Sequence, residues 1–260
     1  MIALIDCDSL MYLAAYKLDD PENLSKHGFE GADEEEYAPY MAEIAADRLE
    51  RMITDIMGDI QKDEHNIHIS GVEVYITKCK NSIRKELSSD YKKGRKPNKI
   101  VNYLRDLYAF QDEVIYDDMY EADDLIADRA RELKGNCIIV TMDKDLIQIG
   151  GFIYNFYRKP SKKDEEGNEI EVYPRKGLMY VSELEAKRFF AKQMLMGDSC
   201  DAVQCLPKVG EKTAEKILAG KESDFSLIRA VLKEYKRVHQ DNYMEQLMLN
   251  KRLLYLGKNI

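Results

Sequence analysis

Three short and almost uninterrupted apolar runs, separated by helical stretches, limit the possible folds of this chain more than any other feature. They cover residues 2–5, 72–77 and 137–142 and are rich in Ile and Val. Strands that are buried on both faces have this composition, because helices cover both sides of a parallel sheet. A fourth run follows at residues 152–157. We therefore predict an α/β fold with a mostly parallel sheet and flanking helices.

The last third of the chain has helical instead of strand periodicity. Residues 158–180 are polar, and Gly167-Asn168 in their middle is typical of a hairpin turn. Helical patterns cover residues 41–60, 99–110 and 121–133, and later residues 182–196, 211–219, 223–238 and 241–256. The sequence thus predicts an α/β domain over residues 1–181, followed by a helical region over residues 182–260.

Nothing in the sequence indicates a membrane or an oxidising compartment. There is no run of about 18 apolar residues. Residues 1–6 (MIALID) have no basic lead, so we expect a strand there and not a signal peptide. The five cysteines are scattered, with no C-x-x-C pair and no nearby histidine. We expect reduced thiols and a cytoplasmic location.

The charge distribution is strongly uneven along the chain. The net charge of −9 disfavours a polyanionic partner, and residues 1–76 carry 18 acids against five bases. Residues 78–99 reverse this, with nine Lys and Arg against Glu86 and Asp90. We interpret this basic island, which contains Tyr91, as a nucleic-acid contact. The alternative is a solvated helix face.

Acidic residues follow two of the predicted strands. Asp6 and Asp8 come at the end of the first run, and Asp143 and Asp145 come at the end of the third. Ligands of open parallel sheets bind at the carboxyl ends of the strands, so these two pairs are expected to converge. We expect a structural role for Asp8.

Two further acidic groups extend this pattern. Glu121-Ala122-Asp123-Asp124 opens a predicted helix, and Asp198 lies three residues before Asp201. Helix-dipole compensation, caps and turns explain each group separately. Their gathering in one crevice would be repulsive, however, and would raise their pKa values. Two Mg²⁺ or Mn²⁺ ions would relieve that repulsion and could hold a phosphodiester.

The ordered motifs resemble one protein family. They are Leu4-Ile5-Asp6, Arg84, Tyr91-Lys92-Lys93-Gly94-Arg95-Lys96, Glu121-Ala122-Asp123-Asp124, Asp143-Lys144-Asp145, Gly197-Asp198-x-x-Asp201 and residues 206–214 (LPKVGEKTA). Over residues 2–220 the chain is similar to the bacterial and bacteriophage 5′-nucleases, which are flap endonucleases and 5′→3′ exonucleases. With no polymerase portion, it resembles the stand-alone phage enzymes. The resemblance implies a PIN-like (resolvase-like) fold, a helical arch at about 78–120 and a helix-three-turn-helix at about 195–220.

The resemblance also implies roles for particular residues. Lys92 and Arg95 would approach the scissile phosphate from the arch helix, Arg84 could reach phosphate, and Tyr91 would stack on a base. The implied metal ligands are Asp6, Glu121, Asp123, Asp124, Asp143, Asp145, Asp198 and Asp201. The implied DNA-binding residues are Tyr91, Lys92, Lys93, Arg95, Lys96, Lys208, Gly210, Lys212 and Thr213.

The implied activity is hydrolysis of phosphodiesters at or near 5′ ends of DNA by two Mg²⁺ (or Mn²⁺) ions. The implied substrates carry a 5′ single-stranded flap, an end or a nick, and RNA–DNA hybrids that include RNA primers are further candidates. The family resemblance adds K⁺ at the helix-three-turn-helix and replication proteins as candidate partners. It places the protein in the host cytoplasm if a phage encodes it.

One position departs from the family pattern. The family usually has an aspartate seven residues before the arginine that Arg84 matches, and here Thr77 stands in its place. A hydroxyl binds Mg²⁺ weakly, so we expect a looser first cation. Two alternatives remain open. One is a haloacid-dehalogenase-type phosphatase, with Asp6 as nucleophile, Asp8 as acid and Thr77 binding phosphate. The other is a non-catalytic protein that binds branched DNA.

Overall fold

A six-stranded sheet forms the centre of the molecule. The computed structural model describes residues 1–62, 67–79, 81–157, 162–163, 169–170 and 177–258. The sheet order is β3-β2-β1-β4-β5-β8, and only the β5–β8 pairing is antiparallel. Its strands are β1 (Ile2–Asp6), β2 (Gly71–Tyr75), β3 (Val114–Ile115), β4 (Cys137–Val140), β5 (Gly151–Asn155) and β8 (Gly177–Val181). The predicted α/β fold with a mostly parallel sheet is confirmed.

Strand β1 shows why the first apolar run is nearly continuous. Ala3 and Ile5 point into one hydrophobic core, whereas Leu4 points into a second core on the opposite face of the sheet. Successive side chains of a strand alternate between faces, so a strand covered on both sides has no polar positions. The single charged residue of β1, Asp6, comes at its carboxyl end.

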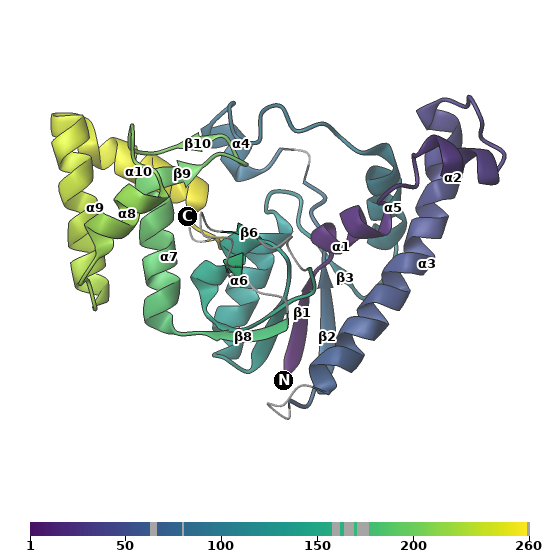
Figure 1. Cartoon of the computed structure of the whole chain (residues 1–260), viewed down its shortest axis with the longest axis horizontal. Helices are drawn as coiled ribbons and strands as arrows, with labels where there is room; N and C mark the ends of the chain where they lie inside the picture. The colour runs from purple at the N-terminus through teal and green to yellow at the C-terminus, as the bar shows by residue number, and fades with distance from the viewer. Residues whose placement is uncertain (63–66, 80, 158–161, 164–168, 171–176, 259–260) are drawn as a thin grey trace.

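Helices cover each face of the sheet (Figure 1). Core residues of α1 (Cys7–Ala14), α3 (Glu34–Gln61) and α5 (Lys99–Ala109) pack on the first face. On the second face lie α6 (Ala122–Leu133), the 3-10 helix η1 (Lys144–Ile149) and the start of α7 (Glu183–Met196). The segment of residues 19–36 contains the short helix α2 (Pro21–Lys26) and the beginning of α3.

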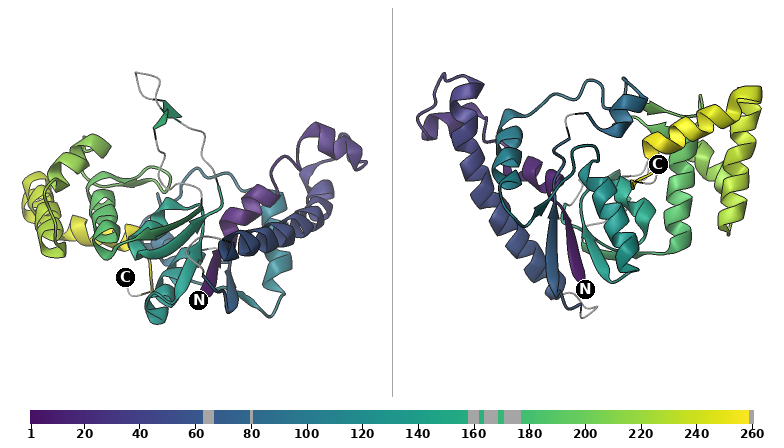
Figure 2. Two further views of the ribbon diagram at one scale, coloured as in Figure 1. Left: turned by 60° about the horizontal axis from the view of Figure 1, so that its bottom comes forward. Right: turned by 180° about the vertical axis from the view of Figure 1, so that it is seen from behind.

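The C-terminal helices form a third core beside the sheet. Both views of Figure 2 place this helical group at the opposite end of the molecule from α2 and α3. It consists of α7, α8 (Glu211–Leu218), α9 (Asp224–His239), η2 (Gln240–Asn242) and α10 (Tyr243–Leu254). The predicted boundary at residue 182 precedes α7, but α7 joins both parts. Its Ala186 packs in the sheet core, and its Leu195 packs in the helical core.

Several local predictions need correction. Residues 177–181 form edge strand β8 instead of continuing a polar excursion. A two-stranded ribbon, β9 (Gly197–Asp198) with β10 (Val203–Gln204), interrupts the expected run of helices. Gly197 has φ +80 there, which favours glycine at this sharp change of direction. In the predicted hairpin, β6 (Lys162–Lys163) pairs with β7 (Glu169–Ile170). The Gly167-Asn168 turn lies outside the described residues.

The predicted arch region is less helical than expected. The short helix α4 (Ile83–Leu87) is followed by turns over residues 89–94, and no helix covers Lys92 or Arg95. In Figure 1 this segment crosses the top of the molecule between α4 and α5. Lys92 at φ 54 and Gly94 at φ 87 have left-handed backbone conformations, which interrupt a right-handed helix. The prediction that an arch helix presents these cations is therefore wrong.

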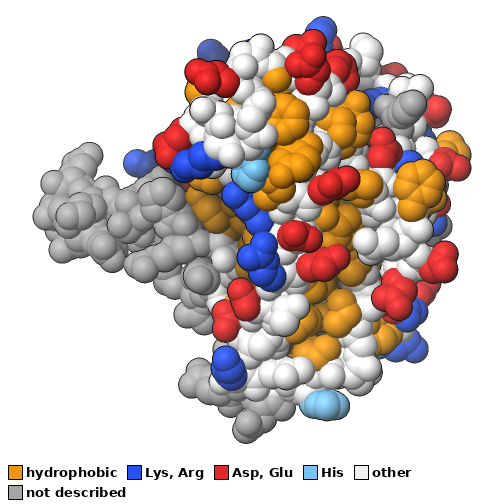
Figure 3. Space-filling model, turned by 90° about the vertical axis from the view of Figure 1, so that its right-hand side faces the viewer, with side chains coloured by type: hydrophobic (Ala, Val, Ile, Leu, Met, Phe, Trp, Pro, Cys, Tyr) orange, Lys and Arg blue, Asp and Glu red, His pale blue; other side chains and the backbone are white. Residues whose placement is uncertain are grey.

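The surface beside α2, α3 and α5 has mixed character. Figure 3 shows acidic and basic side chains interspersed among exposed apolar ones on this face. The exposed apolar residues of the chain include Tyr40 and Leu107. Over the described residues, no helix combines the length and the apolar character that crossing a bilayer requires.

Candidate active site

Asp6 links the ends of β1 and β4. The hydroxyls of Ser9 and Thr141 each donate a 2.6 Å hydrogen bond to Asp6 Oδ2. Thr141 Oγ1 in turn accepts a bond from the backbone N–H of Asp143 at 2.9 Å. Burial, together with the carboxylates of Asp8 and Asp143, raises the pKa of Asp6 to about 6. The carboxyl edge of the sheet therefore brings the first two acidic pairs together.

Asp145 and Asp198 meet at Lys144, which follows β4. The Lys144 ammonium bonds Asp198 and lies 3.2 Å from Asp145 Oδ1. Gln193 of α7 donates to the same Asp145 oxygen at 2.9 Å. Burial raises the pKa of Asp145 to about 7, and Asp143 and Asp198 add to the rise. Burial alone would raise the pKa of Asp198, but Lys144 lowers it.

Glu121 precedes the first turn of α6 and is almost completely buried. Its Oε2 accepts from Tyr91 Oη and from Lys92 Nζ, both at 2.9 Å, and from Arg84 Nη1 at 3.2 Å. Burial alone would raise its pKa, but Lys92 and Arg84 lower it below its ordinary value. Glu121 is thus an ionised carboxylate surrounded by donors.

Asp123 connects Glu121 electrostatically with the sheet edge. Burial raises its pKa well above the ordinary value, Lys92 opposes that rise, and Glu121 and Asp143 add to it. The first turn of α6 is where an acidic side chain can leave the helix face. Asp143 raises the pKa of Asp6, Asp123 and Asp145, so these acids lie near one another. We call them, together with Glu121, Asp198 and Asp201, the acidic cluster.

Asp201 extends the cluster to the loop between β9 and β10. Its carboxylate accepts from Arg95 Nη2 at 2.5 Å and from Tyr91 Oη at 3.0 Å. Its backbone carbonyl accepts from Lys92 N at 2.9 Å. Residues 91–95 are consequently fastened between Glu121 on one side and Asp201 on the other.

Three predicted site residues have other roles in this structure. Arg84 is 1% exposed and bonds both oxygens of Asp124, so it does not reach a phosphate at the surface. Asp124 has its carboxylate occupied by that pairing and is not available as a metal ligand. Tyr91 is 4% exposed and is fastened through its hydroxyl to Glu121, so its ring does not present a stacking face.

The remaining basic residues of the arch differ in accessibility. The Lys92 side chain is 17% exposed and that of Arg95 is 55% exposed, and both border the acidic cluster. Lys93 is exposed and pairs with Asp90 at 2.8 Å. Lys96 is also exposed. Lys92 and Arg95 are therefore the cations that lie directly against the acids.

Thr77 caps α6 and is not arranged as a ligand. Its hydroxyl accepts from the backbone N–H of Ala122 at 2.9 Å, and its own N–H donates to Asp8 at 2.9 Å. Asp8 also accepts two bonds from Arg105, at 3.0 and 2.9 Å. The expected structural role of Asp8 agrees with these contacts. Asp8 is therefore paired with Arg105 and is not the free acid that the phosphatase alternative needs.

The acidic cluster fits divalent cations by its donor chemistry. Within the described residues, no three Asp, Glu, His or Cys side chains form a ready-made cage for an ion. Lys92, Arg95 and Lys144 instead lie between the carboxylates. Burial is the main cause of the raised pKa values of Asp6 and Asp145, and repulsion from neighbouring carboxylates adds to the rise. Hard cations such as Mg²⁺ prefer carboxylate oxygens, and positive charge relieves this repulsion.

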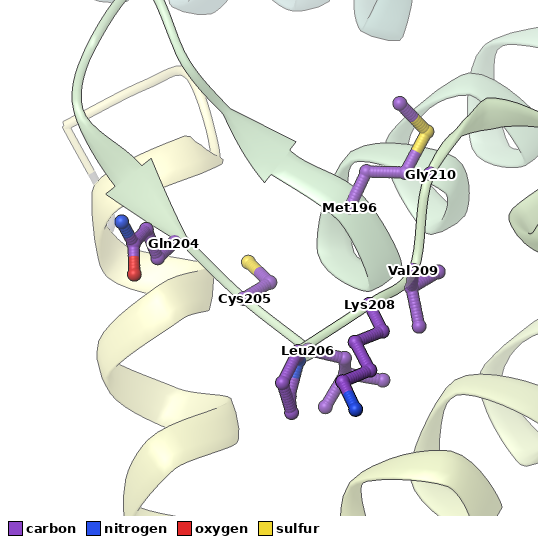
Figure 4. Close-up of a pocket in the computed structure, with 8 residues that line it drawn as sticks. Met196, Gln204, Cys205, Leu206, Lys208, Val209 and Gly210 are labelled. Atoms are coloured by element: carbon purple, nitrogen blue, oxygen red, sulfur yellow. The ribbon is translucent and has the colours of Figure 1, made fainter.

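The predicted helix-three-turn-helix contains an exposed loop before α8. Residues 204–210 and Met196 line an open pocket of about 710 Å³, and the Lys208 side chain extends from the loop (Figure 4). No side chain caps α8, whose preceding residue is Gly210. Lys208, Gly210, Lys212 and Thr213 are all exposed. A basic loop before a helix start is suited to a phosphate backbone.

Sequence reasoning missed three residues of the site. Thr141 bridges Asp6 and Asp143, Lys144 lies between Asp145 and Asp198, and Gln193 holds Asp145. The position of Lys144 inside the Asp143-Lys144-Asp145 motif was an available signal. Gln193 had none, because it lies 48 residues from its partner.

Comparisons with known protein sequences find related nucleases and polymerases. A family model described as 5′-3′ exonuclease, N-terminal resolvase-like domain, matches residues 1–173. The chain is 31% identical over 192 residues to DNA polymerase I of Streptococcus pneumoniae, covering 70% of this chain and 21% of that protein. It is 32% identical over 151 residues to flap endonuclease Xni of Shewanella halifaxensis, covering 53% and 54%. The chain thus spans about a fifth of the polymerase and half of the flap endonuclease.

Solved structures show the same fold at low sequence identity. The T5 D15 protein co-crystallised with metal ions has a TM-score of 0.58 and 14% identity, covering 97% of this chain and 88% of that one. T5 5′-exonuclease with bound zinc has a TM-score of 0.55 and 15% identity, covering 97% and 86%. The similarity therefore extends over the C-terminal helices as well as the sheet.

Proposed function

Since this chain belongs to the 5′-3′ exonuclease family, we propose that it is a structure-specific 5′ nuclease that hydrolyses phosphodiesters at or near 5′ ends of DNA. The observation that carries the proposal is the cluster of carboxylates from β1, β4, α6 and the β9–β10 ribbon, bordered by Lys92 and Arg95. Crowded acids beside two cations suit divalent metal ions and a phosphate.

The proposed ligands are the acids of the cluster that lack a bidentate partner. Mg²⁺ or Mn²⁺, when bound, would supply the positive charge and Lewis acidity that phosphodiester hydrolysis needs. Asp124 is left out because Arg84 occupies it. The proposed ligands are Asp6, Glu121, Asp123, Asp143, Asp145, Asp198 and Asp201.

The basic residues of the arch would orient the scissile phosphate. Lys92 and Arg95 already bond Glu121 and Asp201, so they lie close to where a phosphate would come if metal ions at these acids held it. Their charges would stabilise the charge that develops on the phosphoryl group. The products would be a 5′-phosphate and a 3′-hydroxyl.

The helical region would hold the duplex part of the substrate. The loop at Lys208 and the start of α8 would contact the phosphate backbone without reading sequence. We propose DNA with a 5′ flap, end or nick as the substrate, with RNA–DNA hybrids as a further class. K⁺ at the carbonyls of residues 204–210 and replication proteins are further candidate partners.

The test uses DNA that carries a labelled single-stranded 5′ flap, incubated with protein and Mg²⁺ or Mn²⁺. Short labelled 5′ fragments are the expected result, and chelation should stop their formation. Inorganic phosphate released from small esters, without DNA cutting, would instead establish a phosphatase. A shifted but intact DNA band under all metal conditions would establish a non-catalytic binder and overturn the proposal.

A further inference from the structure

The C-terminal segment of residues 255–258, which we call the C-terminal strap, returns from α10 to the acidic cluster. The strap lies against α6, because its last residue donates from its backbone to Asp128 of that helix. Leu256 of the strap is 4% exposed and packs in the core that lies between the sheet and α6. Lys258 fastens its end, donating from its backbone to Asp128 at 2.9 Å and from its side chain to Asp117 at 3.0 Å.

One side of the strap supports Glu121. The Tyr255 carbonyl accepts from Arg84 Nη2 at 2.9 Å, and the Gly257 N–H donates to Asp124 Oδ1 at 2.9 Å. Both partners then contact Glu121. Arg84 Nη1 donates to the carboxylate of Glu121, and the backbone N–H of Glu121 donates to Asp124 Oδ2 at 3.3 Å. The strap thus completes the buried network that sets where Glu121 lies.

The other side of the strap supports Asp145. The Leu256 N–H donates to Gln148 Oε1 at 3.0 Å. Gln148 Nε2 approaches Gln193 Oε1 at 3.5 Å, and Gln193 Nε2 donates to Asp145 Oδ1 at 2.9 Å. Each glutamine amide has one oxygen that accepts and one nitrogen that donates, so each hydrogen bond in this series fixes the orientation of the next amide.

We infer that the C-terminal strap is a positioning element that fixes Glu121 and Asp145, two carboxylates on different parts of the cluster, in their places for metal binding. This inference rests on the proposed function, because it assumes that the cluster holds divalent cations. The strap touches neither carboxylate and acts through Arg84, Asp124, Gln148 and Gln193. It also ties the cluster to α10, so the helical region contributes to the geometry of the metal site.

Gly257 offers a direct test of the strap. It has φ +129, and a Cβ atom there would lie 2.5 Å from Arg131 Nη1 and 2.6 Å from Asp128 Oδ1. Gly257→Ala should therefore push aside the ends of the Arg131 and Asp128 side chains, and Asp128 is the acceptor that fastens Lys258 at the end of the strap. Gly28→Ala is the matched control, because Gly28 has φ +81 and no atom within 4 Å of its Cβ position. Both variants place alanine at a positive φ, but only Gly257→Ala meets neighbouring atoms of the network.

The readout is Mn²⁺ affinity in the absence of DNA, measured by titration calorimetry. Residues that hold metal ligands in place typically change metal affinity about 10–100-fold when replaced, so Gly257→Ala should bind Mn²⁺ at least about 10-fold more weakly. Gly28→Ala should bind as the wild type does. Circular dichroism would establish that both variants are folded.

A second variant keeps the test decisive if Gly257→Ala fails to fold. Gln148→Met removes the acceptor of the Leu256 N–H and the contact to Gln193, and Gln61→Met at an exposed site is its control. Gln148→Met should weaken Mn²⁺ binding and lower kcat on flap DNA more than it changes KM. If the folded variants bind Mn²⁺ as tightly as the wild type, the inference is wrong. If the wild type binds no Mn²⁺, the proposed function itself fails.

Discussion

Arg84 bonds both carboxylate oxygens of Asp124, at 2.7 Å through Nη1 and 2.5 Å through Nη2, and neither side chain reaches solvent. Burial alone would lower the pKa of Arg84, but Asp124 raises it, so the guanidinium stays charged. Removing one partner would leave the other charged and unpaired in the interior.

Arg84→Met is therefore expected to lower the free energy of unfolding by about 3–5 kcal/mol. Urea denaturation would measure the loss. Arg51→Met, at an exposed site on α3, should have little effect. The double change Arg84→Met with Asp124→Leu should recover part of the stability, because Asp124 no longer remains as an unpaired buried charge. A loss no larger than that of Arg51→Met would contradict the buried ion pair.

Lys92→Ala should slow cleavage of flap DNA about 100-fold, because a donor aimed at the phosphate is lost. The log–log salt dependence of DNA binding should flatten by about 0.9 if one phosphate contact disappears. Lys26→Ala, on exposed α2, is the control for charge alone. An unchanged rate together with an unchanged slope would remove Lys92 from the mechanism.

Changing both Asp143 and Asp145 to Asn should abolish cutting and leave DNA binding intact. Asn keeps the cap that Asp143 provides to the backbone N–H of Asp145, so the local fold should persist. Gel-based cleavage and binding assays on the same flap DNA separate the two effects. Asp55→Asn, at an exposed site on α3, should cut normally. Persistent cutting by the double variant would show that these acids hold no catalytic metal.

Asp6→Asn should stabilise the metal-free protein at neutral pH while abolishing cleavage. The pKa of Asp6 rises from 3.8 to about 6 on folding, mainly through burial, so the native state holds this proton more tightly than the unfolded chain. Ionisation then costs stability as pH increases through this interval, and the full cost persists above it. The expected gain is about 1–3 kcal/mol at about pH 8 and nearly zero at about pH 3.5. Thermal unfolding with chelator would measure it, and an equal gain at both pH values would contradict this explanation.

Thr77→Ala should cost about 0.5–2 kcal/mol of stability, because the backbone N–H of Ala122 loses its acceptor at the start of α6. Thr77→Ser should restore most of it. Chemical denaturation of both variants would measure these differences in the free energy of unfolding. If Thr77→Ala left stability unchanged but weakened Mn²⁺ binding, Thr77 would be a ligand and not a cap.

The sheet and part of the site were predictable because their signals are local. The apolar runs end at Asp6 and shortly before Asp143, and parallel strands place such ends at one edge. The burial of Arg84 was not predictable, because its partners lie 37, 40 and 171 residues away. The orientation of Tyr91 likewise depends on Asp201, 110 residues further along the chain. The motifs show which charged residues are present, but they do not show which of these residues form ion pairs with one another.

Lys144 lies against both Asp145 and Asp198, so a positive charge is built into the site by the chain itself. Removal of metal ions should consequently leave the fold of this protein intact, whereas small domains whose folding requires a metal would unfold. A metal ion held by Asp145 and Asp198 would replace one positive charge with another, and the Lys144 ammonium would then be free to turn toward a phosphate. The newly synthesised polypeptide can therefore mature first and acquire its ions afterwards.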